Sequence, residues 1–358
     1  FTLIIAAYVI AGGLRGVMYT DALQGTIMFV SMFFLLFWTY KTIGMSFAEA
    51  NQNLTDMAQL VPEKLQAIGH QGWTSMPKFG SAWWYTLVTS LIMGVGIGVL
   101  AQPQLVVRFM TVRSNKELNR AVLIGTVFIA VTTGIIYTVG TVSNIFFMQI
   151  EGKIAIEAVK DLDKIIPEYI KASMPAWFAA VFMLTILSAS MSTLSSQFHA
   201  MGSSIGRDVV STLIRRPHNN TLITRLGVAL SIIVSYIICY TLNMGVIARG
   251  TAIFFGICAA SFLPAYFCSI YWKRATRKAA FASMVSGFGV SLLMLLFTHQ
   301  KESSALGISE AIFGKPVLFE HMPWPVLDPI VISLPVSIIV IIAISLLTPK
   351  QKAVTVAA

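Results

Sequence analysis

The chain has 358 residues, of which 56% are hydrophobic and 11% are charged, and its mean hydropathy is +0.78. A soluble domain carries about 25% charged residues, so this composition excludes a water-soluble globular protein. The formal net charge is +10, but the basic residues form short clusters between apolar stretches, which excludes a nucleic-acid-binding surface. We therefore predict an integral membrane protein whose surroundings are a lipid bilayer.

A short apolar stretch, residues 1–10, opens the sequence, and Gly12-Gly13 ends it. It is only half as long as a membrane-spanning helix, which needs about 20 apolar residues. We expect that the sequence begins inside a helix; a short interfacial segment is the alternative.

Eight longer apolar stretches follow, and each is long enough to cross a membrane as a helix. Because the backbone of a spanning segment must satisfy its own hydrogen bonds in lipid, we predict an all-α fold. It has eight full transmembrane helices and a partial first one, and residues 1–358 are expected to form one transmembrane domain. The predicted spans are residues 18–40, 82–108, 121–147, 176–205, 222–242, 251–271, 279–298 and 329–347.

Lysine and arginine gather in alternate loops and predict the orientation of the chain, because cytoplasmic loops are rich in these residues. The C-terminus is then cytoplasmic, the loops 42–80 and 152–172 are extracytoplasmic, and the location is the cell membrane (plasma or inner). The basic residues on which this rests are Arg15, Arg108, Arg113, Lys116, Arg120, Arg207, Arg215, Arg216, Arg225, Lys273, Arg274, Arg277, Lys278, Lys350 and Lys352.

The loop 152–172 has a helical pattern of its own. Its apolar residues recur at intervals of three and four, which predicts an amphipathic helix lying at the membrane interface. We interpret this helix as a packing element and not as a ligand site. The residues in the pattern are Val159, Leu162, Ile165, Ile166 and Tyr169.

The second span contains glycines at alternate positions followed by Gln102-Pro103, a pattern that is unfavourable for a continuous helix. Pro103 removes a backbone donor and clashes with the preceding turn. A helix broken inside the membrane presents free backbone groups to a substrate, so Gly96, Gly98, Val99 and Gln102 are candidate substrate-binding residues. Close helix packing through small residues is the alternative.

Asp21 is an acidic residue inside a predicted span. A carboxylate in hydrocarbon is costly and is functional by default. The alternative is an aspartate in the first cytoplasmic turn of a helix, where the helix dipole favours a negative charge. Gln24 follows one turn later and is placed to face the same side.

A run of small and hydroxyl residues, from Ala189 to Ser196, lies in the fourth span. Ala189, Ser192, Thr193 and Ser196 share one face of a helix, and Ser195 flanks that face. Hydroxyls, carbonyls and a carboxylate are hard oxygen ligands that suit a small cation. Packing of small residues between membrane helices is again the alternative.

The remaining reactive residues form no catalytic pattern. The cysteines fall in apolar spans without disulfide or metal spacing. His199 is interpreted as a hydrogen-bonded core residue, and no acid–base pair is spaced to support an enzyme that uses His199 with Asp208. We expect neither enzymatic activity nor a cofactor.

At these residues the chain resembles the sodium–solute symporter family, whose members share the LeuT-type inverted-repeat helical bundle. The stretches 12–24 and 189–197 carry the likeness in combination, and 102–110 and 271–277 add to it. The likeness covers essentially the whole chain, from the end of the family's fourth core helix onward. The first core helix is therefore expected to lie outside this sequence.

The resemblance implies two sodium sites. The family's main site combines backbone carbonyls of the first core helix with eighth-helix positions that correspond here to Ala189, Ser192 and Thr193. A second site, used by members such as the sialic acid transporters, matches Asp21, Ser192, Ser195 and Ser196.

The resemblance also implies a secondary active transporter that couples sodium to the symport of a small organic solute by alternating access. The stretch 102–110 is most similar to proline permeases, but those have aromatic residues at the positions of Val95 and Val99. That departure argues against proline as the solute. A small carboxylate-bearing solute, such as a monocarboxylate or a pantothenate-like acid, fits the resemblance as well as proline does. Proton coupling through Asp21 and a transporter-like membrane sensor are the alternatives, and the oligomeric state is left open.

Overall fold

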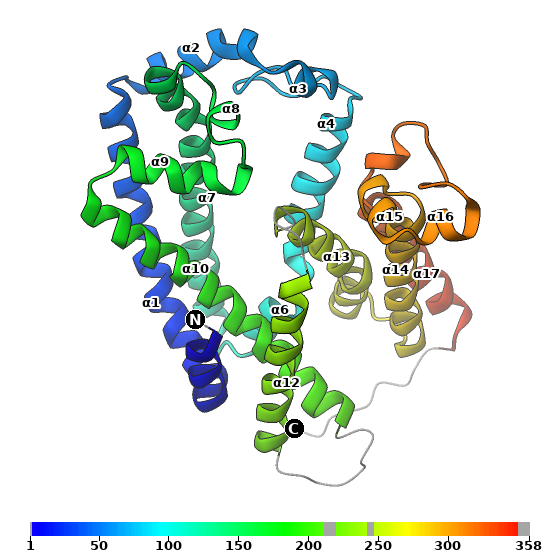
Figure 1. The fold of residues 1–358 in the computed structure, drawn as a ribbon. Coiled ribbons are helices and arrows are strands. Elements are labelled where there is room, and N and C mark those ends of the chain that lie inside the picture. Colours follow the sequence, from blue (N-terminus) through cyan, green and yellow to red (C-terminus); the bar gives the residue numbers. More distant parts are fainter. Residues whose placement is uncertain (1, 211–219, 242–246, 350–358) are drawn as a thin grey trace. The chain divides into compact units, whose positions relative to one another are not determined.

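The computed structural model describes residues 2–210, 220–241 and 247–349 of the chain. These residues form helices and connecting turns, with no strand among them, and eight helices are long and apolar enough to cross a membrane. The eight helices coincide with the eight predicted spans, which confirms the all-α membrane fold (Figure 1). Four residues used to predict the orientation, Arg215, Arg216, Lys350 and Lys352, lie outside the described residues.

The chain forms two compact units, residues 1–60 with 111–245 and residues 61–110 with 246–358. Each unit combines segments that are distant in sequence, so the order of the helices along the chain does not follow the grouping in space. The single transmembrane domain over residues 1–358 stays a prediction.

The first unit is built on long helices that pack along one another. Helix α1 lies against α10 and α7, and α10 lies against α12 (Figure 1). Close approach of α10 and α12 depends on glycine, because a Cβ on Gly227 would collide with the carbonyl of Gly202. The elements of this unit are α1 (Thr2–Ile43), α2 (Phe47–Asp56), η1 (Met57–Leu60), α7 (Asn115–Glu151), α8 (Ala155–Val159), η4 (Leu162–Lys164), α9 (Ile165–Ser173), α10 (Ala176–Ser203), η5 (Ser204–Val210) and α12 (Asn220–Thr241).

Helix α1 is two helices joined at a sharp kink. Gly13 has φ 53° and ψ −154°, a backbone conformation that residues with a Cβ rarely adopt. The apolar opening stretch therefore ends at the predicted glycine pair, and a second helical segment continues from there to Ile43. Apolar side chains on both sides of the kink join one core with α10 and α12, formed by Ile5, Val9, Val17, Phe198, Val228 and Ile232.

The loop 152–172 differs from its prediction. Instead of one amphipathic helix it contains α8, η4 and α9, because Lys160 at the end of α8 has the left-handed φ of 60°. The packing role is confirmed: the Tyr169 phenol on α9 donates to Thr39 Oγ1 on α1 at 2.9 Å, and both residues are fully buried.

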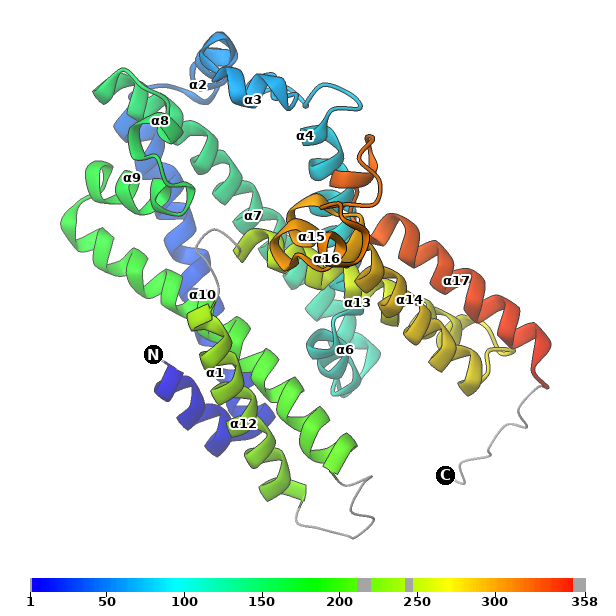
Figure 2. The same ribbon diagram turned by 45° about the vertical axis from the view of Figure 1, so that its right-hand side comes forward.

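The second unit is organised around α13, which contacts α14, α17 and the segment from η2 to η3. Helices α14 and α17 lie side by side (Figure 2), and the hydroxyls of Ser283 and Ser337 meet between them at 2.8 Å. The elements are α3 (Glu63–Ala67), α4 (Ala82–Tyr85), η2 (Thr86–Val95), α5 (Gly96–Gly98), η3 (Val99–Ala101), α6 (Pro103–Met110), α13 (Ile247–Tyr271), α14 (Arg277–Phe297), α15 (Gln300–Leu306), α16 (Ile308–Phe313), η6 (Trp324–Val326) and α17 (Ile330–Leu347).

Candidate functional site

The second span is a broken helix, as predicted. It changes from α-helix to a wide π-helical segment at Thr86–Val95, and then to a tight 3-10 turn at Val99–Ala101. At Gln102 the backbone leaves the helix, with φ −67° and ψ 124°, and α6 begins at Pro103. Proline causes the break because it disfavours the helical conformation in the residue before it and has no N–H to donate.

The four candidate substrate residues occupy different surroundings at this break. Gly98 is buried, and a Cβ there would collide with the backbone carbonyl of Phe255 on α13, so this glycine permits close packing. Gly96 is exposed and a Cβ there would meet nothing within 4 Å. Val99 is half-buried. The packing alternative therefore applies to Gly98, and Gly96 faces open space.

Gln102 is the most informative of the four. The residue is 4% exposed, and its Oε1 accepts a hydrogen bond from Gln104 Nε2 at 2.9 Å. Its Nε2 finds no partner among the described residues. A buried donor left without an acceptor costs about 1–3 kcal/mol, so this amide group is set to donate to an acceptor that the described residues do not supply.

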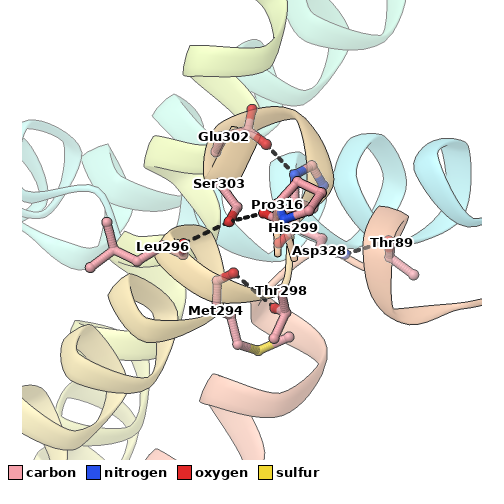
Figure 3. Close-up of polar contacts among 9 residues, drawn as sticks. All are labelled: Thr89, Met294, Leu296, Thr298, His299, Glu302, Ser303, Pro316 and Asp328. Atoms are coloured by element: carbon pink, nitrogen blue, oxygen red, sulfur yellow. Dashed lines mark hydrogen bonds and ion pairs between the residues drawn. The ribbon is translucent and has the colours of Figure 1, made fainter. Parts of the chain in front are cut away.

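Asp328, which is not among the residues predicted from the sequence, joins the broken helix to the start of α17. Its backbone N–H donates to Thr89 Oγ1 on η2 at 3.1 Å (Figure 3). Its Oδ1 accepts from the Ile330 N–H at 3.0 Å. It is 2% exposed, and burial raises the pKa of its carboxyl. The available sequence signal was an aspartate followed by Pro329 directly before an apolar span, which is a typical helix start.

Polar contacts continue around Asp328 in the same unit. His299 contacts Glu302, and the buried Ser303 hydroxyl reaches two backbone carbonyls, those of Leu296 and Pro316 (Figure 3). These bonds hold the turn after α14 in place. They position His299 and Glu302, whose charges act on the Asp328 carboxyl.

The second region of interest lies in the first unit, where Asp21 on α1 meets two serines on α10. Asp21 Oδ1 accepts from Ser195 Oγ at 3.3 Å, and its Oδ2 accepts from Ser196 Oγ at 3.2 Å. Asp21 lies eight residues beyond the kink at Gly13, so it is past the first turn of its helical segment. A helix-dipole role in the first turn therefore does not account for it.

The hydroxyl run on α10 forms two groups of oxygen atoms. The Ser195 and Ser196 hydroxyls also approach the Ser192 carbonyl, at 3.1 and 2.9 Å. One turn earlier, the hydroxyls of Ser192 and Thr193 both donate to the Ala189 carbonyl, at 2.9 and 3.0 Å. The structure thus brings Asp21 together with Ser195, Ser196 and the Ser192 backbone, while Ala189 and Thr193 belong to the neighbouring turn.

Burial distinguishes these two groups. Ser195 is fully buried, Asp21 and Ser196 are half-buried, and Thr193 is more open than Ser195. Among the described residues no cluster of three or more His, Cys, Asp or Glu could hold a metal ion. The oxygen atoms around Asp21 are hard donors, and this set suits an alkali cation better than a transition metal.

Comparison with known proteins decides the family. The family model described as "Sodium:solute symporter family" matches residues 1–287 of the chain. The chain belongs to the sodium:solute symporter family. The resemblance read from the stretches 12–24 and 189–197 is thereby confirmed.

Individual relatives are transporters. The chain is 25% identical over 297 residues to the sodium/pantothenate symporter of Haemophilus influenzae, covering 82% of this chain and 57% of that protein. It is 26% identical over 293 residues to the high-affinity proline transporter PutP of Bacillus subtilis, covering 79% of this chain and 56% of that protein. The chain therefore spans little more than half the length of these relatives.

A solved structure shows the same fold. The solved structure is that of a sodium-coupled sialic acid symporter in its substrate-bound, outward-open state, and it is described as revealing a novel sodium site. The TM-score is 0.71 at 17% sequence identity, over 99% of this chain and 67% of that one. The likeness confirms the predicted LeuT-type bundle. The family to which the chain belongs consists of sodium-coupled transporters and not of enzymes.

Proposed function

We propose that the full-length protein is a sodium-coupled symporter that carries a small organic solute across the cell membrane by alternating access. The observation that carries this proposal is the Asp21 carboxylate, which lies within a spanning helix and accepts from Ser195 and Ser196 of another. An intramembrane carboxylate surrounded by hydroxyl oxygens is an expected arrangement for an ion pathway.

Two sodium sites are proposed. One uses Asp21 with Ser192, Ser195 and Ser196. The other uses Ala189, Ser192 and Thr193, and the resemblance to the family implies that its remaining ligands belong to a first core helix. The solved sialic acid symporter has a sodium site described as novel, which supports the idea that members of this fold bind sodium in more than one place.

The solute is proposed to bind at the broken helix, where Gly96, Gly98, Val99 and Gln102 are the candidate contacts. The unpartnered Nε2 of Gln102 supports a solute that offers a hydrogen-bond acceptor, such as a carboxylate. The named relatives carry pantothenate and proline, and both molecules contain a carboxylate. A small carboxylate-bearing solute is therefore our proposal.

Coupling of solute transport to sodium requires that sodium bind two conformations of the protein with different affinities. Sodium shifts the protein toward the solute-binding conformation only if it binds that conformation more tightly than the other. Each sodium ion that enters contributes about 2.3 kcal/mol per 100 mV of membrane potential, in addition to its concentration gradient. In the proposed orientation the loops rich in lysine and arginine, and the C-terminus, face the cytoplasm.

The test is radiolabelled sodium binding to the purified full-length protein, with potassium and choline as competitors. Saturable, sodium-selective binding that is reduced by Asp21→Ala and by Thr193→Ala is the expected result. Absence of sodium-selective binding in a folded protein would reject sodium coupling. Binding of protons at Asp21, measured as pH-dependent uptake without sodium, would then support the proton-coupled alternative.

A further inference from the structure

Gln24 follows Asp21 by three residues on α1, so the two side chains lie on neighbouring positions of one helix face. Gln24 is 8% exposed, and its Oε1 is shielded from solvent and has no hydrogen-bond partner among the described residues. A buried amide oxygen without a donor costs about 1–3 kcal/mol. This oxygen therefore needs an explanation beyond packing.

The donors near Gln24 are already directed at other acceptors. The Ser195 and Ser196 hydroxyls reach Asp21 and the Ser192 carbonyl. The Tyr8 phenol, which lies beside the Gln24 and Ser195 side chains, donates to the Met191 carbonyl at 3.2 Å. Each hydroxyl has a single proton, so none of these groups is left to donate to Gln24 Oε1.

The atoms gathered here are therefore mainly oxygens that can coordinate a positive charge. They comprise the Asp21 carboxylate, two serine hydroxyls, a backbone carbonyl and the amide oxygen of Gln24. A cation at this position would satisfy the Gln24 oxygen and offset the negative charge of Asp21 together, which a neutral donor would not do.

We propose that Gln24 Oε1 is a ligand of the cation that binds at Asp21, and that it contributes to the selectivity of this site for sodium. The inference rests on the proposed sodium site at Asp21, Ser192, Ser195 and Ser196. It goes beyond that site by adding a ligand from α1, so that α1 holds the ion through two side chains and α10 holds it through its hydroxyl run.

Two substitutions separate an oxygen ligand from a space-filling or donating role. Gln24→Met keeps the length and volume of the side chain and removes the oxygen. Gln24→Glu keeps an oxygen at the same reach and removes the amide N–H groups. Ser31→Ala is the matched control, because Ser31 is also a buried polar residue on α1, two turns further along.

The experiment measures sodium binding and the sodium-to-lithium affinity ratio for these variants and for Asp21→Asn, all in the full-length protein. For Gln24→Met we expect sodium binding at the Asp21 site to weaken by about tenfold or more, with an altered lithium ratio. Gln24→Glu is expected to bind sodium at least as tightly as the parent, and Ser31→Ala to leave both quantities unchanged.

The outcomes separate this inference from the proposed function. Loss of one class of sodium sites in Asp21→Asn with unchanged binding in Gln24→Met would overturn the Gln24 ligand and leave the site standing. Unchanged binding in Asp21→Asn would reject the site itself. If Gln24→Met fails to fold, Gln24→Glu decides the matter, because weak sodium binding by that variant would show that the amide donor matters instead of the oxygen.

Discussion

The Ser195 hydroxyl on α10 donates to the Asp21 carboxylate on α1 at 3.3 Å, across 174 residues of sequence. The contact lies where α1 and α10 pack along each other, close to the core formed by Val17, Phe198 and Val228. A carboxylate in such a place is retained at a cost in stability unless it is paired or bound to an ion. The hydroxyls satisfy part of its hydrogen-bonding capacity.

The Asp21–Ser195 contact is expected to appear as an energetic coupling. Ser195→Ala removes a donor to a charged group, which costs about 1.5–3 kcal/mol, and in an Asp21→Asn background the same change is expected to cost clearly less. Thermal unfolding of the four proteins in sodium-free detergent measures the coupling. Ser203→Ala is the control, since the Ser203 hydroxyl donates to the Ala200 carbonyl within its own helix. Additive effects of the two substitutions would contradict the contact.

Gly98 and Gly96 form a matched pair for testing the role of glycine at the broken helix. Gly98→Ala places a Cβ against the Phe255 carbonyl, which cannot move without shifting α13, so we expect a loss of about 1–3 kcal/mol. Gly96→Ala meets nothing within 4 Å and is expected to leave stability unchanged or slightly improved. Unfolding temperatures measure both effects. A fall in solute uptake by stable Gly96→Ala protein would place Gly96 in contact with the solute.

Gln102 is expected to matter for the solute more than for stability. Gln102→Met removes a buried donor that has no partner among the described residues, and it also removes the Oε1 that accepts from Gln104. The two effects oppose each other, so the unfolding temperature is expected to change little. The affinity for the solute is expected to fall by about tenfold, the effect of losing one hydrogen bond to a charged group. Uptake kinetics with the pantothenate and proline classes of solute measure this. A large loss of stability in Gln102→Met would contradict the prediction.

Asp328 is expected to make stability depend on pH. Burial raises the pKa of its carboxyl above the ordinary value of 3.8, so the folded protein binds this proton more tightly than the unfolded chain does. The proton on Asp328 therefore stabilises the folded protein. This stabilisation is complete below a pH of about 3.8 and is lost as the pH rises through the higher pKa of the folded state.

Asp328→Asn is expected to remove this contribution to the pH dependence. Its side-chain oxygen still accepts from the Ile330 N–H, so the start of α17 stays capped, and no charge needs to be buried at neutral pH. Unfolding temperatures of both proteins between acid and neutral pH measure the difference. The charges of His299 and Glu302 act on the Asp328 carboxyl, so Glu302→Gln is the control, and equal slopes for parent and Asp328→Asn would contradict the assignment.

Local chemistry made much of the fold predictable from the sequence. Apolar length identified the eight spans, the glycine pair marked the kink in α1, and Pro103 marked the break at Gln102. The loop 152–172 was mistaken for one helix because its apolar spacing is regular, whereas Lys160 adopts a left-handed conformation that ends α8.

The sequence by itself determined which segments cross the membrane and where the backbone leaves the helix, because hydrophobicity and the geometry of glycine and proline act over a few neighbouring residues. Only the tertiary structure decided which distant polar groups meet. It joined Thr89 to Asp328 across 239 residues and left the Gln24 oxygen buried without a donor among the residues that the structure describes. Spacing along one helix cannot specify such pairs, since they depend on how two helices pack and which faces they turn toward each other.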